Sequence, residues 1–380
     1  MKKILISLIA TLLFLSELAA KSSEDIDHIS LAALLIRDGN IQRALLELKE
    51  IDLKDDVTDY IRFYTLKALA YMKNKDFKLA VDNFELAIKK GQKDPVVNIY
   101  IAQSYFQMGA FQKALDVFNS AGAISDSKPQ YFSLRAQCHW NLEAYTNAFN
   151  TLDLGLKKFP TYTTFLKQKF FYYTELKLFE RAMDVAQAFI KKDKDRAKAY
   201  QIVGSALNRA KELDRALKIV QEGKLVFPKN SDITVMLAHL YIKKGHIQAA
   251  ADLFEQASIL DSKYIKEASE LYRRAKKLYR SLYYNRQIKD QKEKYKQRLA
   301  ILLEFGDFEM AAAMEAAMKR IDLIKDEDIR YALAFTLFQT AQYEKAEKHL
   351  SKLMRSDLFT KGIELRKSIA TCKQSPWECY

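Results

Sequence analysis

Small and apolar residues recur along this chain with a period of 34 residues. An alanine marks each period, with an apolar residue three places before it and another four places after it. Residues three or four apart share one face of an α-helix, whereas one face of a strand repeats every second residue. The pattern therefore predicts amphipathic helices. The alanines of six successive periods are Ala80, Ala114, Ala148, Ala182, Ala216 and Ala250.

A second small residue usually stands twelve places before each of these alanines. Ala102 and Gly204 belong to this column, and Phe170 interrupts it. Two helices approach closely only where a residue is small, so both columns are expected at helix crossings. Aromatic residues fill the wider gaps beside the crossings. We therefore expect the regularly spaced tyrosines and phenylalanines to belong to the core. Prolines fall at the boundaries of the periods, at Pro95, Pro129, Pro160 and Pro228.

The spacing and the two small-residue columns resemble the tetratricopeptide repeat, a helix–turn–helix unit of 34 residues. The resemblance covers nearly all of the chain after residue 24, with further copies centred on Ala44, Ala311 and Ala346. It implies an all-α superhelical solenoid of stacked antiparallel helix pairs, with a shorter helical bundle at the C-terminal end. Each pair buries its apolar face only against its neighbours.

The period fails once, because 61 residues rather than two full periods separate Ala250 from Ala311. The segment 263–298 lacks the turn signal of glycine, any residue and an aromatic, and it reads as a long helix broken near Asn285. We therefore expect about seven repeats over residues 25–262, a basic helical divider over 263–298, helix pairs over 299–371 and a tail over 372–380.

The first residues predict a signal peptide over residues 1–20. Lys2 and Lys3 precede an apolar run that ends at Leu15, and small residues follow it. The run is shorter than the roughly 20 residues that span a bilayer. Cleavage after Ala20 and cleavage after Ser22 both fit, and an uncleaved anchor is the alternative. We expect export through the inner membrane to the periplasm, as a soluble or peripherally attached protein.

Export changes how the three cysteines are interpreted. Cys372 and Cys379 lie close together near the C-terminus, and an oxidising compartment favours a bridge between them. Two unpaired thiols in a frayed tail are the alternative. Cys138 stands alone in a helical pattern, where a small buried apolar residue is expected.

Catalytic signals are absent from the sequence. The chain has only 10 glycines and 5 prolines, which disfavours an all-β fold, and it has no glycine-rich phosphate loop and no metalloprotease or hydrolase motif. The five histidines show no spacing typical of metal ligands; they are His28, His139, His239, His246 and His349. The prediction is a protein without enzymatic activity, cofactor or metal.

The resemblance also implies which side chains line a groove, because the first helix of each tetratricopeptide pair faces inward. Amides and aromatics at these positions suit an extended peptide. An ordinary solvated groove is the alternative, and the Lys and Asn set with which some members clamp a terminal carboxylate is missing. The candidate groove residues are Gln103, Phe106, Gln107, Gln130, Ser133, Gln137, Trp140, Asn141, Lys167, Phe171, Gln201, Ser205, Asn208 and His239.

The segment 263–298 carries 13 basic and 4 acidic residues in a chain of formal net charge +14. A basic helix with interleaved tyrosines suits an acidic protein or an anionic membrane surface. Export argues against nucleic acid, and a solvated helix is the alternative. The candidate docking residues are Arg273, Arg274, Lys276, Lys277, Arg280, Tyr283, Tyr284 and Arg286.

Taken together, these features predict an exported scaffold or adaptor that binds other proteins. Exported bacterial tetratricopeptide proteins often support envelope machines, so the resemblance implies a flagellar motor, a pilus or a secretion system. The alternatives are an enzyme-associated subunit, a cell-wall or outer-membrane biogenesis factor, and a cytoplasmic nucleic-acid-associated regulator. The sequence does not predict the partner or the oligomeric state.

Overall fold

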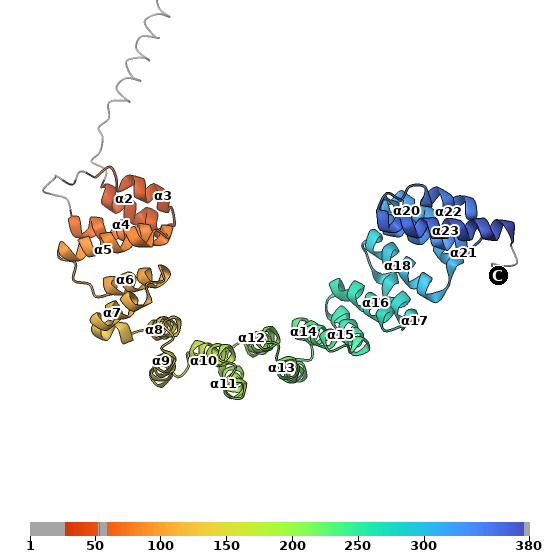
Figure 1. Cartoon of the computed structure of the whole chain (residues 1–380). Coiled ribbons are helices and arrows are strands. Elements are labelled where there is room, and N and C mark those ends of the chain that lie inside the picture. The colour runs from red at the N-terminus through yellow and green to blue at the C-terminus, as the bar shows by residue number, and fades with distance from the viewer. Residues whose placement is uncertain (1–26, 52, 54–58, 376–380) are drawn as a thin grey trace, which may run out of the picture. The chain divides into compact units, whose positions relative to one another are not determined.

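The structure is a computed structural model that describes residues 27–51, 53 and 59–375 (Figure 1). Across these residues the chain is built from helices, with no β-strand among them. It forms two compact units that divide between Lys169 and Phe170, within α10 (Thr164–Glu175). The predicted signal peptide, residues 1–20, lies outside the described residues.

In the first unit, consecutive helices pack as pairs, and each pair stacks on the next (Figure 1). A short 3-10 helix, η1 (Gly122–Asp126), connects the third pair to the fourth. The pairs are α2 (His28–Arg37) with α3 (Ile41–Glu47), α4 (Tyr60–Asn74) with α5 (Phe77–Lys89), α6 (Val96–Gln107) with α7 (Phe111–Ser120), and α8 (Pro129–Asn141) with α9 (Tyr145–Lys158).

The second unit continues the pairing after α11 (Phe179–Lys192). Its pairs are α12 (Arg196–Arg209) with α13 (Leu213–Val226), α14 (Ser231–Lys243) with α15 (Ile247–Leu260), α16 (Ile265–Arg274) with α17 (Leu278–Gln287), α18 (Gln291–Phe305) with α19 (Phe308–Ala313), and α21 (Glu327–Gln339) with α22 (Tyr343–Leu350). The remaining elements are η2 (Ser262–Tyr264), α20 (Glu315–Arg320), η3 (Leu323–Lys325) and α23 (Ser356–Gln374).

The alanine column predicted from the sequence is buried throughout. Ala80, Ala114 and Ala250 have no exposed surface, and neither do the more distant copies at Ala311 and Ala346. Each lies in the second helix of its pair, where the absence of a long side chain allows the first helix to approach. The predicted all-α fold of stacked helix pairs is confirmed.

A left-handed residue ends the first helix of the pairs. At α6 it is Gly109, with φ of 75°, and the backbone N–H of Ala110 donates to the carbonyl of Tyr105 at 2.9 Å. This is the hydrogen-bond pattern of a Schellman C-cap, which satisfies carbonyls at the helix end. The same turn holds Lys75 after α4 and Lys211 after α12, so glycine is not required for it.

The predicted divider at 263–298 is corrected by the structure, because this segment begins with another helix pair, α16 and α17, which packs on α15. The expected break near Asn285 is present, since α17 ends at Gln287 and α18 begins at Gln291, but the long helix expected before it is wrong, because the chain also turns at Lys276, whose φ is 58°. Ser281 stands in the alanine column and Ser269 in the other small column. Each serine hydroxyl donates to the other residue's carbonyl, at 3.1 and 2.7 Å. The repeat is therefore shortened here but not interrupted.

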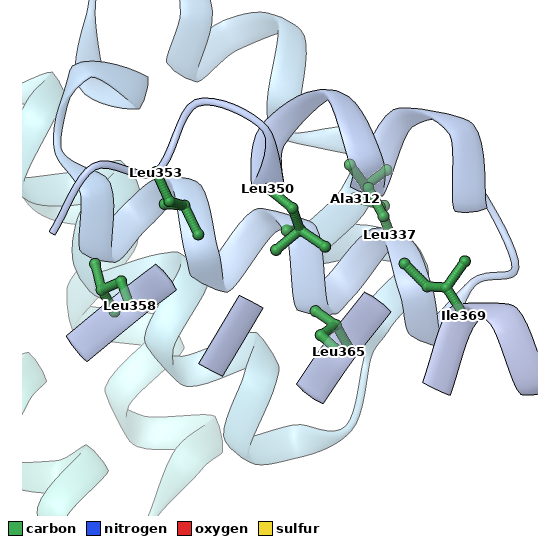
Figure 2. Close-up of a cluster of buried hydrophobic side chains, with 9 residues drawn as sticks. Ala312, Leu337, Leu350, Leu353, Leu358, Leu365 and Ile369 are labelled. Atoms are coloured by element: carbon green, nitrogen blue, oxygen red, sulfur yellow. The ribbon is translucent and has the colours of Figure 1, made fainter. Parts of the chain in front are cut away.

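The C-terminal helix α23 covers the last pair of the second unit (Figure 2). Its side chains Leu358, Leu365 and Ile369 are buried together with Leu350 and Leu353 of the preceding helix and the loop after it. One face of α23 therefore closes the apolar end of the stack, as a terminal repeat requires a cap.

Candidate protein-binding faces

In the first unit, the predicted groove positions of α6 carry accessible side chains. Gln103 and Phe106 are half-buried, and Gln107 is exposed. The Phe106 ring packs edge-to-face on Phe111, with centroids 5.6 Å apart. This contact holds the aromatic side chain in place while part of its surface stays accessible.

On α8 the amide side chains form a row along one face. Gln137 Nε2 donates to Asn141 Oδ1 at 3.5 Å, and Gln130 lies exposed near the start of the helix. Ser133 is half-buried, and its hydroxyl has no hydrogen-bond partner within the described part of the chain. These side chains offer donors and acceptors for an extended backbone.

Trp140 is a correction to the predicted groove. Its side chain is only 7% exposed and belongs to the core between α8 and α9. The indole packs against Tyr145 at 4.7 Å and against Phe149 at 6.2 Å between ring centroids. The face of α8 that turns toward its pair partner is apolar, and a tryptophan gains more by packing there than by lining a groove.

Gln168 is a half-buried amide between α8 and α10 that the predicted groove set does not include, although its neighbour Lys167 belongs to that set. Gln168 Nε2 donates to the carbonyl of Ser133 at 3.2 Å, which links α10 to α8 within the first unit. Its Oε1 atom is buried and has no partner among the described residues. Lys167 is half-buried. The sequence signal that could have identified Gln168 is its amide side chain directly beside Lys167.

In the second unit, Phe171 lines a cavity of about 630 Å³ together with Phe179 and Ala206. Arg209 and Glu212 also line this cavity, so it combines apolar walls with charge of both signs. This mixture suits a side chain of a protein partner better than a uniformly apolar ligand.

Four more predicted positions in the second unit differ in their exposure and contacts. Gln201 and Ser205 are half-buried on α12. Asn208 Oδ1 accepts a hydrogen bond of 2.9 Å from Lys243 Nζ, which joins α12 to α14. His239 is exposed, and its ring packs edge-to-face on Phe254 at 5.4 Å between centroids.

The predicted basic docking residues are partly neutralised by carboxylates of the same helix and of neighbouring helices. Arg273 donates to both carboxylate oxygens of Glu270, at 2.5 and 2.9 Å, and also contacts Glu304 on α18. Lys276 Nζ lies 2.6 Å from Glu304 as well. Arg280 lies near two carboxylates of α15. The segment therefore presents less positive charge than its sequence indicates.

The remaining docking residues divide between exposed and buried. Arg274, Lys277, Tyr283 and Arg286 are exposed. Tyr284 is only 8% exposed, so it does not belong to a docking surface and the prediction is corrected for it. Whether the exposed members bind an anionic partner stays a prediction.

Within this segment, Tyr272 of α16 and Tyr284 of α17 form a buried pair of phenols. Their rings stack at 5.7 Å, and both hydroxyls donate to Glu255, with a bond of 2.5 Å from Tyr284. Asp252 Oδ1 also lies 2.8 Å from the Tyr272 hydroxyl, so the two carboxylates are alternative acceptors for its single proton. Burial and these carboxylates raise the pKa of both phenols well above the ordinary value for tyrosine.

Cysteine and metal chemistry are limited in the described part of the chain. Cys138 is buried, and burial raises the pKa of its thiol to about 12. Cys372 is buried in α23, but Cys379 lies outside the described residues, so their bridge stays a prediction.

Over residues 27–51, 53 and 59–375, no group of three His, Cys, Asp or Glu side chains is placed to hold a metal ion. In the same ranges, no helix has the length and apolar character needed to cross a membrane.

The described helices define an α-helical repeat protein with accessible polar side chains on its first helices. Two family models match the chain, one described as tetratricopeptide repeat over residues 232–264 and one as anaphase-promoting complex, cyclosome, subunit 3 over residues 73–154. With the 34-residue spacing and the stacked helix pairs, these matches show that the chain contains repeats of the tetratricopeptide type, with the repeat model itself matching residues 232–264. Such repeats are generally non-enzymatic scaffolds that mediate protein–protein interactions, and the fold fits that role.

Individual relatives are distant. The chain is 28% identical over 122 residues to tetratricopeptide repeat protein 4 of Bos taurus, and the alignment covers 31% of each protein. The match thus spans about a third of that relative's length. Solved structures that resemble the chain include the C-terminal part of a repeat protein from Cytophaga hutchinsonii, at 14% identity and a TM-score of 0.44, covering 60% of this chain and 96% of that one. A tetratricopeptide repeat protein from Parabacteroides merdae resembles it at 16% identity and a TM-score of 0.39, covering 74% of this chain and 100% of that one.

Proposed function

We propose that this chain is an exported, non-enzymatic scaffold that holds segments of other proteins within a bacterial cell-envelope assembly. The observation that carries the proposal is the set of accessible amide side chains on the first helices of two successive pairs in the first unit. Gln103 and Gln107 stand on α6 and Gln137 on α8; in the second unit, considered by itself, Gln201 stands on α12. Export rests on the charged, apolar and small-residue parts of the first 20 residues.

The amides suit an extended segment because each offers both a donor and an acceptor to a peptide backbone. Phe106 adds accessible aromatic surface beside Gln103, and aromatic side chains contribute contact area at a low cost in conformational entropy. Each helix pair supplies only a few contacts, so the affinity is the sum of several modest contributions from one unit. A flagellar motor, a pilus or a secretion system is the kind of assembly we propose.

The test is in-cell photocrosslinking from the chromosomally encoded, tagged chain. A photoreactive amino acid at Gln107, on the proposed face, is compared with one at Asn119, exposed on α7 of the same pair. We expect position 107 to capture defined envelope proteins from the periplasmic fraction, and position 119 to capture few.

Equal capture at both positions would overturn the proposed face. Recovery of the chain from the cytoplasm, or together with nucleic acid, would overturn the export and the envelope role. Trp140 is unsuitable for this test, because changing a core residue lowers stability as well as binding.

A further inference from the structure

A small cavity of about 270 Å³ lies in the second unit, with its lining drawn largely from the first helices α14, α16 and α18. Its walls include the apolar side chains of Ile242, Phe254 and Leu271. Cavities for whole small molecules are commonly about 300–1,000 Å³, so this one is sized for a single long side chain. It lies on the predicted groove face, because His239 of the candidate groove also lines it.

Gln297 of α18 contributes an acceptor without a donor. The residue is 8% exposed, and its Nε2 donates to the carbonyl of Lys266 at 3.2 Å and to Glu293 Oε1 at 3.0 Å. Both partners accept hydrogen bonds only, so they fix which end of the amide is the nitrogen. The Oε1 atom is buried, and no donor from the described residues reaches it.

Glu267 of α16 contributes a second acceptor of the same kind. Its Oε2 atom is buried and has no hydrogen-bond partner among the described residues. Lys266 Nζ lies 3.8 Å from the other oxygen, Oε1, beyond hydrogen-bond length. A buried carboxylate oxygen and a buried amide oxygen thus line one small cavity. An N–H donor from a ligand would stabilise both of them.

The other charged groups at the cavity do not supply that donor. Of the two basic residues that line the cavity, Arg274 is exposed, and Lys266 Nζ lies 3.8 Å from Glu267 Oε1 without a hydrogen bond to it. A metal ion is not favoured, because the described residues contain no cluster with the ligands to hold one. A cationic donor also adds positive charge at Glu267 Oε2, the oxygen that Lys266 does not reach, since Lys266 Nζ lies 3.8 Å from Oε1.

We infer that this cavity receives a lysine or arginine side chain of the protein segment bound by the scaffold. The aliphatic stem packs on Phe254 and Leu271, and the N–H groups of the cationic head donate to Glu267 and Gln297. The inference rests on the proposed function, since it names one feature of the segment that the scaffold binds. With this inference, α16 and α18 belong to the binding face, although α16 lies in the segment 263–298 that was predicted to be a divider.

The experiment uses a displayed library of random 12-residue peptides and the purified full chain. Peptides are first selected on the wild-type chain, and those that also bind Glu267→Lys are then removed, because that variant places a competing cation at the site. Affinities of the remaining peptides are measured for the wild type, for Glu267→Gln and for Glu309→Gln. Glu309 is exposed on α19, so its variant removes the same charge away from the cavity. Equal melting temperatures show that the variants are folded.

We expect the remaining peptides to share a basic residue. Replacing that residue by norleucine should weaken binding to the wild type and to Glu309→Gln by about tenfold or more, and should change binding to Glu267→Gln little. Peptides that bind without a required basic residue, or equally well to both variants, would overturn the inference and leave the proposed function intact. If no peptide binds the wild-type chain, both the groove and the cavity inference fail.

Discussion

Gly204 lies where α12 crosses α13, and its replacement by alanine measures how closely the two helices approach. A Cβ atom at this position would lie 2.4 Å from Val220 Cγ2 and 3.3 Å from Met236 Sδ. Val220 is fully buried, and a valine in a helix has one strongly preferred rotamer. The added methyl group therefore forces either an unfavourable rotamer or a separation of the helices.

Two effects of opposite sign determine the change in the free energy of unfolding. Replacing glycine by alanine inside a helix stabilises it by about 1 kcal/mol. Overpacking a well-filled core costs about 1–3 kcal/mol, and a contact of 2.4 Å is far inside the normal separation of carbon atoms, which favours the upper part of that range. The expected net result is a loss of about 1–2 kcal/mol.

Gly362 in α23 supplies a matched control. An added Cβ there meets Leu353 Cδ1 at 3.4 Å and Leu350 Cδ2 at 3.6 Å, which are ordinary contacts. Gly362→Ala should therefore keep the gain in helix propensity and leave stability unchanged or raised by up to about 1 kcal/mol. The same substitution type thus has opposite expected signs at the two glycines.

The assay is urea unfolding of the purified chain followed by circular dichroism, with midpoints compared at unchanged slope. Val220→Ala is added as a second substitution to Gly204→Ala. The double variant should be more stable than the sum of the two single changes predicts, by about 0.5–3 kcal/mol, because the smaller side chain makes room for the new methyl group. A Gly204→Ala chain at least as stable as the wild type would falsify the close approach of α12 and α13.

Three further outcomes are expected. Ala114→Arg should destabilise the fold by about 3 kcal/mol or more, since it buries a charge in a filled crossing, and an unchanged melting temperature would contradict this. Because the folded-state pKa values of Tyr272 and Tyr284 are raised, their contribution to stability is fully present below about pH 10 and is lost as pH rises above it. Melting temperatures from pH 8 to 11 should fall more for the wild type than for the double phenylalanine variant, and parallel curves would refute the linkage. Mass spectrometry of the exported, non-reduced chain should show Cys372 linked to Cys379, and free alkylated thiols at both positions would exclude the bridge.

The repeat architecture was predictable because it depends on contacts between neighbours in the sequence. Alanines such as Ala114 mark crossings within one helix pair, and they recur wherever another pair is added. The pattern is harder to recognise at Ser281, because a serine replaces the alanine and no glycine marks the turn before it. A serine is nearly as small, and Lys276 adopts the left-handed conformation that glycine usually supplies.

The candidate faces were predictable only in part. The resemblance to tetratricopeptide repeats implied inner positions at Gln107 and His239, and both side chains are exposed. It did not separate the groove side of α8 from the side that meets α9, so Trp140 was assigned to the groove although it is core. A helix position near the edge between two faces is decided by the exact angle of packing, which spacing alone does not define.

By itself the sequence determined that this chain folds as stacked α-helical pairs of the tetratricopeptide type, because the small and apolar columns that pack each pair are local and periodic. Only the tertiary structure decided which polar groups are available to a partner. Glu267 and Gln297 line one cavity, and Arg273 is neutralised by Glu304, because separate helices bring these residues together. Such meetings depend on the depth and angle at which helices pack, and the linear pattern of residue types carries neither quantity.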